Sequence, residues 1–521
     1  MSPIAPKKTH FWSDYGRLSR VNQSRTTYVL RAATLKADTL NISLSASVCQ
    51  PGVHQECFHI QLTQHRHMPT SVELLPEDVL REIFKYSVPP PDVFSQGYMK
   101  EEQFKSRCIL VLTYVCSRWR QIALSMPFLW STTCASITDR VGGTFNLRGP
   151  NVEHFMHEWL RRAASVPRTL YIALGPSIDE HLIPINTILA SYPFRRLSIS
   201  DKQVELVPLI DLPNQALEYL EDLNLERSSF KFTHDAKLPN LRSLSITYLS
   251  RGFQRLSVVI PWAQLRHLTL SSFFVSPHLL FNVLKQCSYL EYCSIECLRS
   301  FDPPTPEPFF NITLPNLQSF KFHFFDCDLA VECLRRLAVP SVNTLLLSLT
   351  DVDTSIHSRF IERSDGMPHL RNITLVHWGD APVNKGILLK QFPLLESITI
   401  RNRHLDECGS EMMEDLSTGR IGPHLKHLFI EGGSSVKASL DLLKNRYHNA
   451  MRSTRQHDGQ VCQPTITHFQ SATFEFYCDK PKFRDMIRDA LESNGRSPYQ
   501  CLRWVFSGEL DRTCTLDNIE D

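Results

Sequence analysis

Apolar residues near position 80 recur at helical spacing and give the clearest local pattern in the chain. After Pro76 they form one stripe, with charged residues on the other side, and the stripe consists of Val79, Leu80, Ile83 and Phe84. Proline is tolerated at a first helical position, and Glu77 and Asp78 suit the positive end of the helix dipole. The prolines at 89–91 cannot continue a helix, so the pattern predicts a helix that ends before them.

Two further helical stretches are predicted from Ile109 to Leu124. The second places four residues at positions i, i+3, i+4 and i+7 of one face: Trp119, Ile122, Ala123 and Met126. Three short helices bury little apolar surface by themselves. Apolar residues left on their outer face would therefore be natural anchors for a partner.

Downstream, a pattern of the form L-x-x-L-x-L recurs, and the three apolar positions of each copy are called its anchors. The copies are Phe194, Leu197, Ile199; Leu220, Leu223, Leu225; Leu241, Leu244, Ile246; Leu265, Leu268, Leu270; Leu290, Cys293, Ile295; Leu317, Phe320, Phe322; Val342, Leu345, Leu347; Leu370, Ile373, Leu375; Leu395, Ile398, Ile400; and Leu425, Leu428, Ile430. Successive last anchors lie 21 to 30 residues apart, which is the period of leucine-rich repeats. A later copy is indicated at Phe469, Ala472 and Phe474, and an earlier one at Leu170 and Ile172, after a helix from Asn151 to Ala164.

Between the anchors the hydrophobic period changes to that of a helix, as in the segments near Pro277 and Leu329. Each strand-plus-helix unit has an apolar edge that it can bury only against the next unit. The sequence therefore predicts an α/β fold with a short all-helical module at 71–132, followed by a leucine-rich-repeat solenoid over 150–510 whose parallel strands lie on the concave side. The polar stretch at about 448–463 is interpreted as a mobile insertion.

Residues that flank the second and third anchors should point away from the core, because side chains alternate along a strand. Most are small hydroxyl residues, and we choose Lys321, His323 and Arg401 as candidate contacts for a bound target. Three residues beyond a last anchor, where regular repeats place a buried Asn, the chain has aromatic residues: Phe273, Phe325 and Trp378. These aromatic residues either fill the core or form a rim that grips a partner.

The helical module resembles the F-box motif in its usual order. The resemblance is carried by Leu75-Pro76, the stripe described above, the run Val115–Ala123 and Leu129-Trp130, and it covers about a tenth of the chain. The connection at about 88–106 is longer than in a compact F-box and is similar to a variant common in mushroom-forming fungi. The resemblance implies a non-catalytic adaptor that docks on the Skp-type adaptor of a cullin-RING ubiquitin ligase.

The same resemblance implies which residues dock on the Skp-type adaptor: Leu75, Pro76, Val79, Leu80, Ile83, Phe84, Val115, Trp119 and Ile122. The alternative is that these residues form the module's own core, because aromatic and aliphatic residues at helical spacing are usually core before they are interface. That alternative is favoured for Trp119. Leu75 and Pro76 are favoured as contact residues.

Composition places the chain among ordinary globular proteins, with 42% hydrophobic and 21% charged residues. The net charge of +2 gives no sign of the basic field that nucleic-acid binders carry, so no nucleic-acid partner is expected. The 15 cysteines form no Cys-x-x-Cys pair. No apolar run is long enough to span a bilayer and no secretory segment is recognisable, so we expect a cytoplasmic or nuclear protein without a membrane partner.

Catalytic motifs are not visible in the sequence. Phosphate loops, dinucleotide fingerprints, nucleophile elbows and zinc helices are all missing, so we expect no enzyme activity, no catalytic residue and no cofactor. His154 and His157 lie three apart without a matched ligand set, so no metal site is expected. Residues 1–70 are poorly defined by their pattern and are interpreted as an extension that is partly disordered.

Two hypotheses of function remain open beside that of an unrecognised enzyme. In the first, the chain is the substrate-recognition adaptor of a Skp-cullin-F-box ligase, with the repeats holding an unknown protein substrate. In the second, it is a leucine-rich-repeat scaffold outside ubiquitin ligation, and the F-box-like helices cap the repeats. Exposure of Leu75, Pro76 and the outer stripe of the first helix discriminates between them.

Overall fold

The computed structural model describes part of the chain, which divides into two compact units, Met1–Ala173 and Leu174–Asp521. The described residues are 45–46, 60–61, 75–87, 109–110, 112–137, 151–174, 182–201, 210–226, 230–232, 237–247, 259–274, 277–299, 311–324, 327–349, 354–377, 385–402, 410–431, 436–455, 466–476, 480–506 and 514–515.

Unit 1 consists mainly of short helices. A small antiparallel pair of strands, β1 (Ser45–Ala46) and β2 (Ile60–Gln61), precedes them, and the rest of 1–70 lies outside the described residues, as does the connection predicted at 88–106. The elements that follow are α2 (Glu77–Ser87), α4 (Ser117–Leu124), the 3₁₀ helix η3 (Pro127–Trp130), β3 (Thr132–Ile137), α5 (Asn151–Arg162) and β4 (Arg168–Leu174). The predicted first helix is confirmed, and it ends before the prolines.

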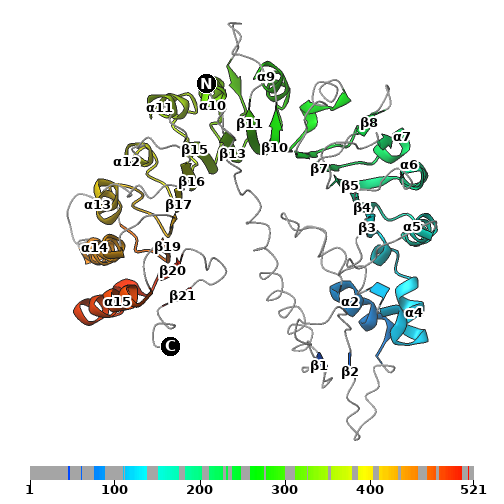
Figure 1. Cartoon of the computed structure of the whole chain (residues 1–521), viewed down its shortest axis with the longest axis horizontal. Helices are drawn as coiled ribbons and strands as arrows, with labels where there is room; N and C mark the ends of the chain where they lie inside the picture. Colours follow the sequence, from blue (N-terminus) through cyan, green and yellow to red (C-terminus); the bar gives the residue numbers. More distant parts are fainter. Residues whose placement is uncertain are drawn as a thin grey trace, which may run out of the picture. The chain divides into compact units, whose positions relative to one another are not determined.

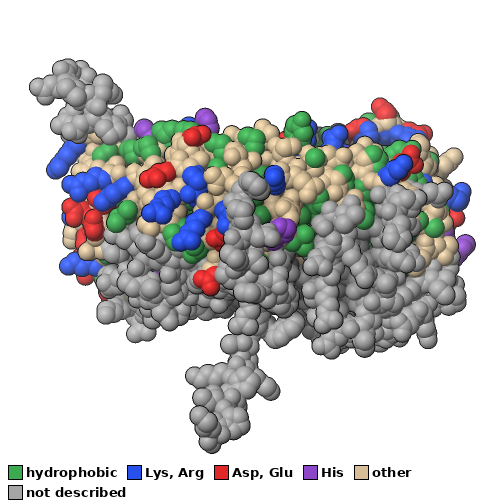
Figure 2. All heavy atoms as spheres, turned by 90° about the horizontal axis from the view of Figure 1, so that it is seen from above, with side chains coloured by type: hydrophobic (Ala, Val, Ile, Leu, Met, Phe, Trp, Pro, Cys, Tyr) green, Lys and Arg blue, Asp and Glu red, His purple; other side chains and the backbone are tan. Residues whose placement is uncertain are grey.

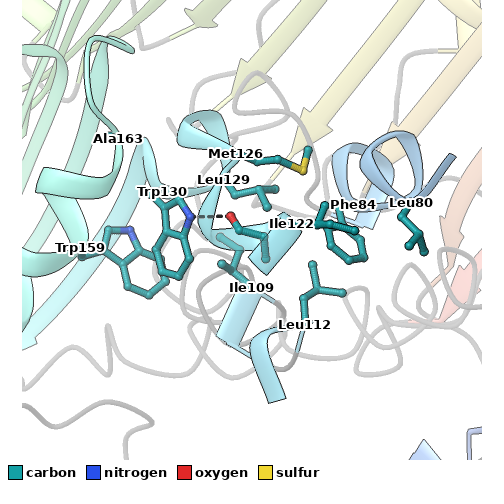
Figure 3. Close-up of a cluster of buried hydrophobic side chains, with 11 residues drawn as sticks. Leu80, Phe84, Ile109, Leu112, Ile122, Met126, Leu129, Trp130, Trp159 and Ala163 are labelled. Atoms are coloured by element: carbon teal, nitrogen blue, oxygen red, sulfur yellow. Dashed lines mark hydrogen bonds between the residues drawn. The ribbon is translucent and has the colours of Figure 1, made fainter. Parts of the chain in front are cut away.

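The core of unit 1 joins the three short helices to α5 (Figure 3). Leu80, Phe84 and Ile122 lie at one end of this cluster, and Trp130 lies at the other, where its indole packs edge-on against Trp159 at 4.8 Å between ring centroids. The Trp130 Nε1 donates a hydrogen bond to the Ala123 carbonyl at 2.9 Å. Two bulky indoles are thus buried together, and the indole nitrogen of Trp130 has a hydrogen-bond acceptor.

The predicted repeat array begins at about residue 150 and so includes α5, which packs into the core of unit 1. The sequence indicated a helix from Asn151 and assigned it to the repeats, but its buried face belongs to unit 1 through Trp159 and Ala163. The guanidinium of Arg162 also lies over the Trp130 ring at 4.7 Å. A helical period shows that a face is apolar and gives no information about which neighbour covers it.

Unit 2 alternates strands with helices along the chain, and in Figure 1 the helices lie along one side of the strand layer. Its strands are β5 (Phe194–Asp201), β6 (Ile210–Leu212), β7 (Asp222–Glu226), β8 (Phe230–Phe232), β9 (Ser243–Thr247), β10 (His267–Phe274), β11 (Tyr292–Arg299), β12 (Ile312–Thr313), β13 (Ser319–Phe324), β14 (Leu337–Ala338), β15 (Thr344–Leu349), β16 (Asn372–His377), β17 (Ser397–Asn402), β18 (His427–Glu431), β19 (Ser471–Phe476), β20 (Leu502–Phe506) and β21 (Cys514–Thr515). Its helices are α6 (Leu182–Ser191), α7 (Asn214–Leu217), η5 (Trp262–Gln264), α9 (Pro277–Gln286), α10 (Cys327–Arg336), α11 (Thr354–Arg363), α12 (Lys385–Leu389), α13 (Ser410–Thr418), α14 (Val436–Arg455), α15 (Lys480–Asn494) and η6 (Ser497–Tyr499).

The main sheet of unit 2 follows the order of the chain, from β5 through β7, β9, β10, β11, β13 and β15 to β20 and β21. Neighbouring strands are parallel, and the anchors stand opposite each other: Leu345 pairs with Phe320 on one side and Ile373 on the other. Every predicted anchor from Phe194 to Phe474 is buried. The recurring pattern thus predicted the strands, their spacing and their buried side correctly.

One copy of the pattern was not recognised in the sequence. Tyr499, Leu502 and Trp504 have the anchor spacing and are buried, and β20 continues the parallel sheet with Leu502 beside Ala472. The aromatic residues at two of the three positions hid this copy from a search for aliphatic anchors. Beyond it, β21 pairs with β20 in the antiparallel sense.

Neighbouring repeats are also joined by a ladder of polar side chains, at the residue directly before the first anchor. Asn240 donates to the Glu218 carbonyl at 2.8 Å, Gln264 to the Leu238 carbonyl at 2.7 Å, and Asn316 to the Ser288 carbonyl at 3.0 Å. Each acceptor belongs to the preceding repeat, so these amides satisfy backbone carbonyls across the junction. These amides lie at the opposite end of the strands from the aromatic positions 273, 325 and 378.

The insertion predicted at about 448–463 is wrong for its first part, because α14 continues to Arg455. The polar residues that suggested a loop stand on the exposed side of this helix, whereas Ala450 and Leu443 are buried on the other. The residues from 456 to 463 lie outside the described part of the chain.

Arg446 of α14 is fully buried and joins adjacent repeats through hydrogen bonds. Its guanidinium donates to the carbonyls of Leu416, Gly422 and Thr467 at 2.6, 2.8 and 2.9 Å, and it lies 4.7 Å from the centroid of the Phe469 ring. Burial lowers the pKa of Arg446 to about 10. The side chain is still a cation at neutral pH, held by carbonyl dipoles in the interior.

Candidate functional site

The Leu75-Pro76 turn is fixed to the rest of the helical module. The Leu80 amide donates to the Pro76 carbonyl at 3.1 Å, which starts α2 directly after the proline. A guanidinium nitrogen of Arg118 on α4 donates to the Leu75 carbonyl at 2.6 Å. Pro76 is exposed and Leu75 is half-buried, so the turn presents a rigid apolar corner at the surface.

The apolar stripe of α2 divides into a buried and an outer part. Leu80 and Phe84 are fully buried, and the Phe84 ring packs edge-on against Trp119 at 5.0 Å between centroids. Ile83 is 37% exposed and Val79 is half-buried. Because successive helical residues are rotated by about 100°, positions 80 and 84 face the core while 79 and 83 lie at its edge.

The third predicted helical segment, which contains α4, also has a buried and an exposed part. Ile122 is buried, Trp119 is half-buried and Val115 is 43% exposed. The thiol of Cys116 accepts a hydrogen bond from the Trp119 amide at 3.4 Å and caps α4. Of the nine residues predicted to dock on an adaptor, Leu80, Phe84 and Ile122 therefore serve the module's core. The other six reach the surface wholly or in part.

Exposed apolar side chains are concentrated in this module. Besides Ile83 and Val115, they include Tyr86 at 73%, Tyr114 at 75%, Leu124 at 40% and Phe128 at 36% exposure. Sequence reasoning missed the two tyrosines, although Tyr86 lies three residues after Ile83 on the same helix face. A small helical module that leaves this much apolar surface uncovered has the composition of a protein-binding site.

The second candidate site is the face of the unit 2 sheet opposite the helices. Lys321 on β13 and Arg401 on β17 are exposed on this face, and His323 is half-buried two residues beyond Lys321. Three strand spacings of about 4.8 Å separate β13 from β17. Arg401 lies two residues beyond Thr399, the residue level with Lys321, so Lys321 and Arg401 stand about 16 Å apart. Phe325, Trp378 and the side chain of Phe273 lie outside the described residues.

Charges on this face differ in how they are compensated. The Nε of Arg401 lies 3.6 Å from a carboxylate oxygen of Glu431, whereas the ammonium of Lys321 lies 5.5 Å from the centroid of the Tyr292 ring. Burial raises the pKa of Glu296, whose neighbour across the strands is His323. On the side of the molecule seen in Figure 2, basic and acidic side chains are intermixed.

Metal-binding groups, membrane-spanning helices or reactive thiols would indicate other kinds of site among the described residues. Within them, no group of three or more His, Cys, Asp or Glu side chains is arranged to hold a metal ion, and no helix has the length and apolarity needed to cross a membrane. Burial raises the pKa of the Cys287 thiol to about 12, which leaves this cysteine unreactive.

Comparison with known proteins identifies one domain. A family model described as F-box-like matches residues 72–136, which include α2, α4 and η3 and end within β3. No curated protein matches the chain. The chain thus carries an F-box-like domain in unit 1, and the match does not extend to unit 2.

Proposed function

We propose that this protein is the substrate-recognition subunit of a Skp-cullin-F-box ubiquitin ligase. The observation that carries the proposal is the F-box-like domain at 72–136, together with the exposed apolar side chains on its first helix. F-box domains generally bind Skp-type adaptors, and through the adaptor they reach the cullin scaffold. The docking surface would consist of Leu75, Pro76, Val79, Ile83, Val115 and the outer edge of Trp119.

Unit 2 would hold the protein to be modified. We interpret its strand-plus-helix array as a leucine-rich-repeat solenoid, on the basis of the 21 to 30 residue period, the aligned anchors and the helices along one side of the strands. The long connection at about 88–106 still favours the F-box variant of mushroom-forming fungi. The intermixed charges of Figure 2 give no support to a nucleic-acid partner.

The mechanism is one of proximity and requires no bond chemistry in this chain. A ligase bound at unit 1 and a target bound at unit 2 are confined to one complex, which raises their effective concentration and lets a partner enzyme transfer ubiquitin. We therefore propose a non-enzymatic protein without cofactor that works in the cytoplasm or the nucleus.

The alternative is a repeat scaffold outside ubiquitin ligation. It would need the apolar edge of α2 to be covered within the chain, whereas Ile83 is 37% exposed and Pro76 is exposed. These exposures favour docking of a partner.

Ile83→Glu tests the docking surface without a change in the core. A carboxylate at a desolvated apolar contact costs several kcal/mol, so we expect affinity of the purified full chain for a purified Skp-type adaptor to fall at least tenfold, measured by calorimetry. Leu394→Glu is the matched control, because Leu394 is likewise 37% exposed but lies in unit 2.

The two variants separate the possible outcomes. Equal affinity of Ile83→Glu and wild type would remove this helix edge from the interface. Failure of the wild-type chain itself to bind any Skp-type adaptor would contradict the ligase function and leave the scaffold.

A further inference from the structure

A single row of side chains crosses seven strands of unit 2 on the face opposite the helices. It contains the residue between the second and third anchors of each strand from β13 to β20, and we call it the middle row: Lys321, Leu346, Thr374, Thr399, Phe429, Thr473 and Arg503. Each member stands opposite the next in the strand register. Since the flanking anchors are buried, the middle row points away from the helices.

On the same face of the first two strands of the main sheet of unit 2, β5 and β7, side chains are already paired with one another. Asn224 donates to the Ser198 hydroxyl at 3.0 Å, Ser200 donates to Glu226 at 2.8 Å, and Arg196 pairs with Asp222 at 2.6 Å. In contrast, the middle-row hydroxyls of Thr374, Thr399 and Thr473 make no side-chain hydrogen bond to any residue that the structure describes. The later strands therefore offer open donors and acceptors.

The two ends of the middle row carry cations without a carboxylate partner among the described residues. The Lys321 ammonium lies 5.5 Å from the centroid of the Tyr292 ring, and Arg503 is exposed at the far end of the row. Elsewhere on the face arginines are compensated, as shown by Arg401 beside Glu431. Leu346 and Phe429 are half-buried apolar members of the same row, and Leu346 stands directly beside Lys321.

The length of the middle row defines the size of its ligand. Six strand spacings of about 4.8 Å separate Lys321 from Arg503, or about 29 Å along the sheet. An extended chain advances about 3.3–3.6 Å per residue, so a segment of eight or nine residues covers the distance. Such a segment can place a carboxylate at each cation and its apolar side chains against Leu346 and Phe429.

We propose that the middle row binds an extended, acidic segment of a target protein that lies across β13 to β20, with carboxylates near both ends about eight residues apart. This inference deepens the proposed function, since it gives the chemistry of the target that unit 2 holds. Exposed ion pairs contribute only about 0.2–1 kcal/mol each. Binding thus depends on both ends being engaged together with the apolar contacts between them.

The test uses a displayed library of random dodecapeptides, selected on the full-length protein. We expect selected peptides to be enriched in pairs of Asp or Glu seven to nine positions apart. Selected peptides, resynthesised with a fluorophore, should bind Lys321→Glu and Arg503→Glu each several-fold more weakly in fluorescence anisotropy, and the double variant more weakly still. The double variant Lys437→Glu, Arg484→Glu makes the same charge change on exposed positions of α14 and α15 and should bind as the wild type does.

Two results would overturn the proposal: selected peptides without acidic enrichment, including basic or purely apolar ones, or equal binding to wild type and to a Lys321→Glu, Arg503→Glu double variant. Failure of this proposal is distinguishable from failure of the ligase function. All three middle-row variants should keep wild-type affinity for the Skp-type adaptor, because their substitutions lie in unit 2 and the adaptor would bind unit 1.

Discussion

Replacing Arg446 by methionine should lower the free energy of unfolding of unit 2 by about 3 kcal/mol or more. Methionine keeps the approximate length and apolar stem of arginine, but it leaves the carbonyls of Leu416 and Thr467 without the Arg446 donor, whereas the Gly422 carbonyl keeps the Leu425 amide. Each buried acceptor that loses its partner costs about 1–3 kcal/mol. The stacking of the guanidinium on the Phe469 ring is lost as well.

Denaturant unfolding followed by circular dichroism measures this effect, and Arg452→Met is the matched control. Arg452 belongs to the same helix but is exposed, so its replacement should change stability by less than about 0.5 kcal/mol. Similar losses of stability in both variants would mean that the buried hydrogen bonds of Arg446 have no special role. In that case a general property of α14, such as its helix propensity, would explain the result.

Trp130→Ala should destabilise unit 1 by about 3–5 kcal/mol, which is the usual range for removing a large buried aromatic side chain. Trp130 is the last residue of η3, is fully buried against Trp159 of α5, and donates from its indole nitrogen to the Ala123 carbonyl. A module as small as this one is only marginally stable. We therefore expect amide hydrogen exchange to accelerate in α2, α4 and α5 together.

Phe128→Ala serves as the control for Trp130→Ala, because Phe128 lies in the same 3₁₀ helix and is 36% exposed. It should leave exchange in these helices nearly unchanged. If Trp130→Ala accelerated exchange in α2 and α4 but left α5 protected, α5 would not belong to the folding unit of the F-box-like helices.

The strands of unit 2 could be predicted because their signal is repeated. Each copy of the anchor pattern is weak, but a regular period and a buried face are imposed on every copy by the same stacking geometry. The end of α14 could not be predicted in this way. The polar face of an exposed helix and a polar loop have the same composition, and only the buried Leu443, Arg446 and Ala450 distinguish them.

The candidate site on α2 shows a second limit of sequence reasoning. An apolar stripe at i, i+1, i+4 and i+5 covers both the side of a helix that faces the core and the edges beside that side. The sequence gives the stripe but not the direction from which α4 approaches, and that direction decides that Leu80 and Phe84 are buried while Ile83 is partly exposed. Likewise, the pairing of Arg401 with Glu431 depends on the register of two strands far apart in sequence.

The proposed function assigns separate tasks to the two units. The apolar edge of α2 and the Leu75-Pro76 turn would bind the ligase, and the middle row from Lys321 to Arg503 would bind the target. Neither task requires an ionisable group of unusual reactivity. Variants of one surface should therefore leave the other surface functional.

Hydrogen exchange of the full chain with and without a purified Skp-type adaptor tests the docking of unit 1 most directly. The account predicts slower exchange within Glu77–Ser87 when the adaptor is bound, loss of this protection in Ile83→Glu, and no change at β13 to β20. Unchanged exchange in α2 at saturating adaptor would contradict it.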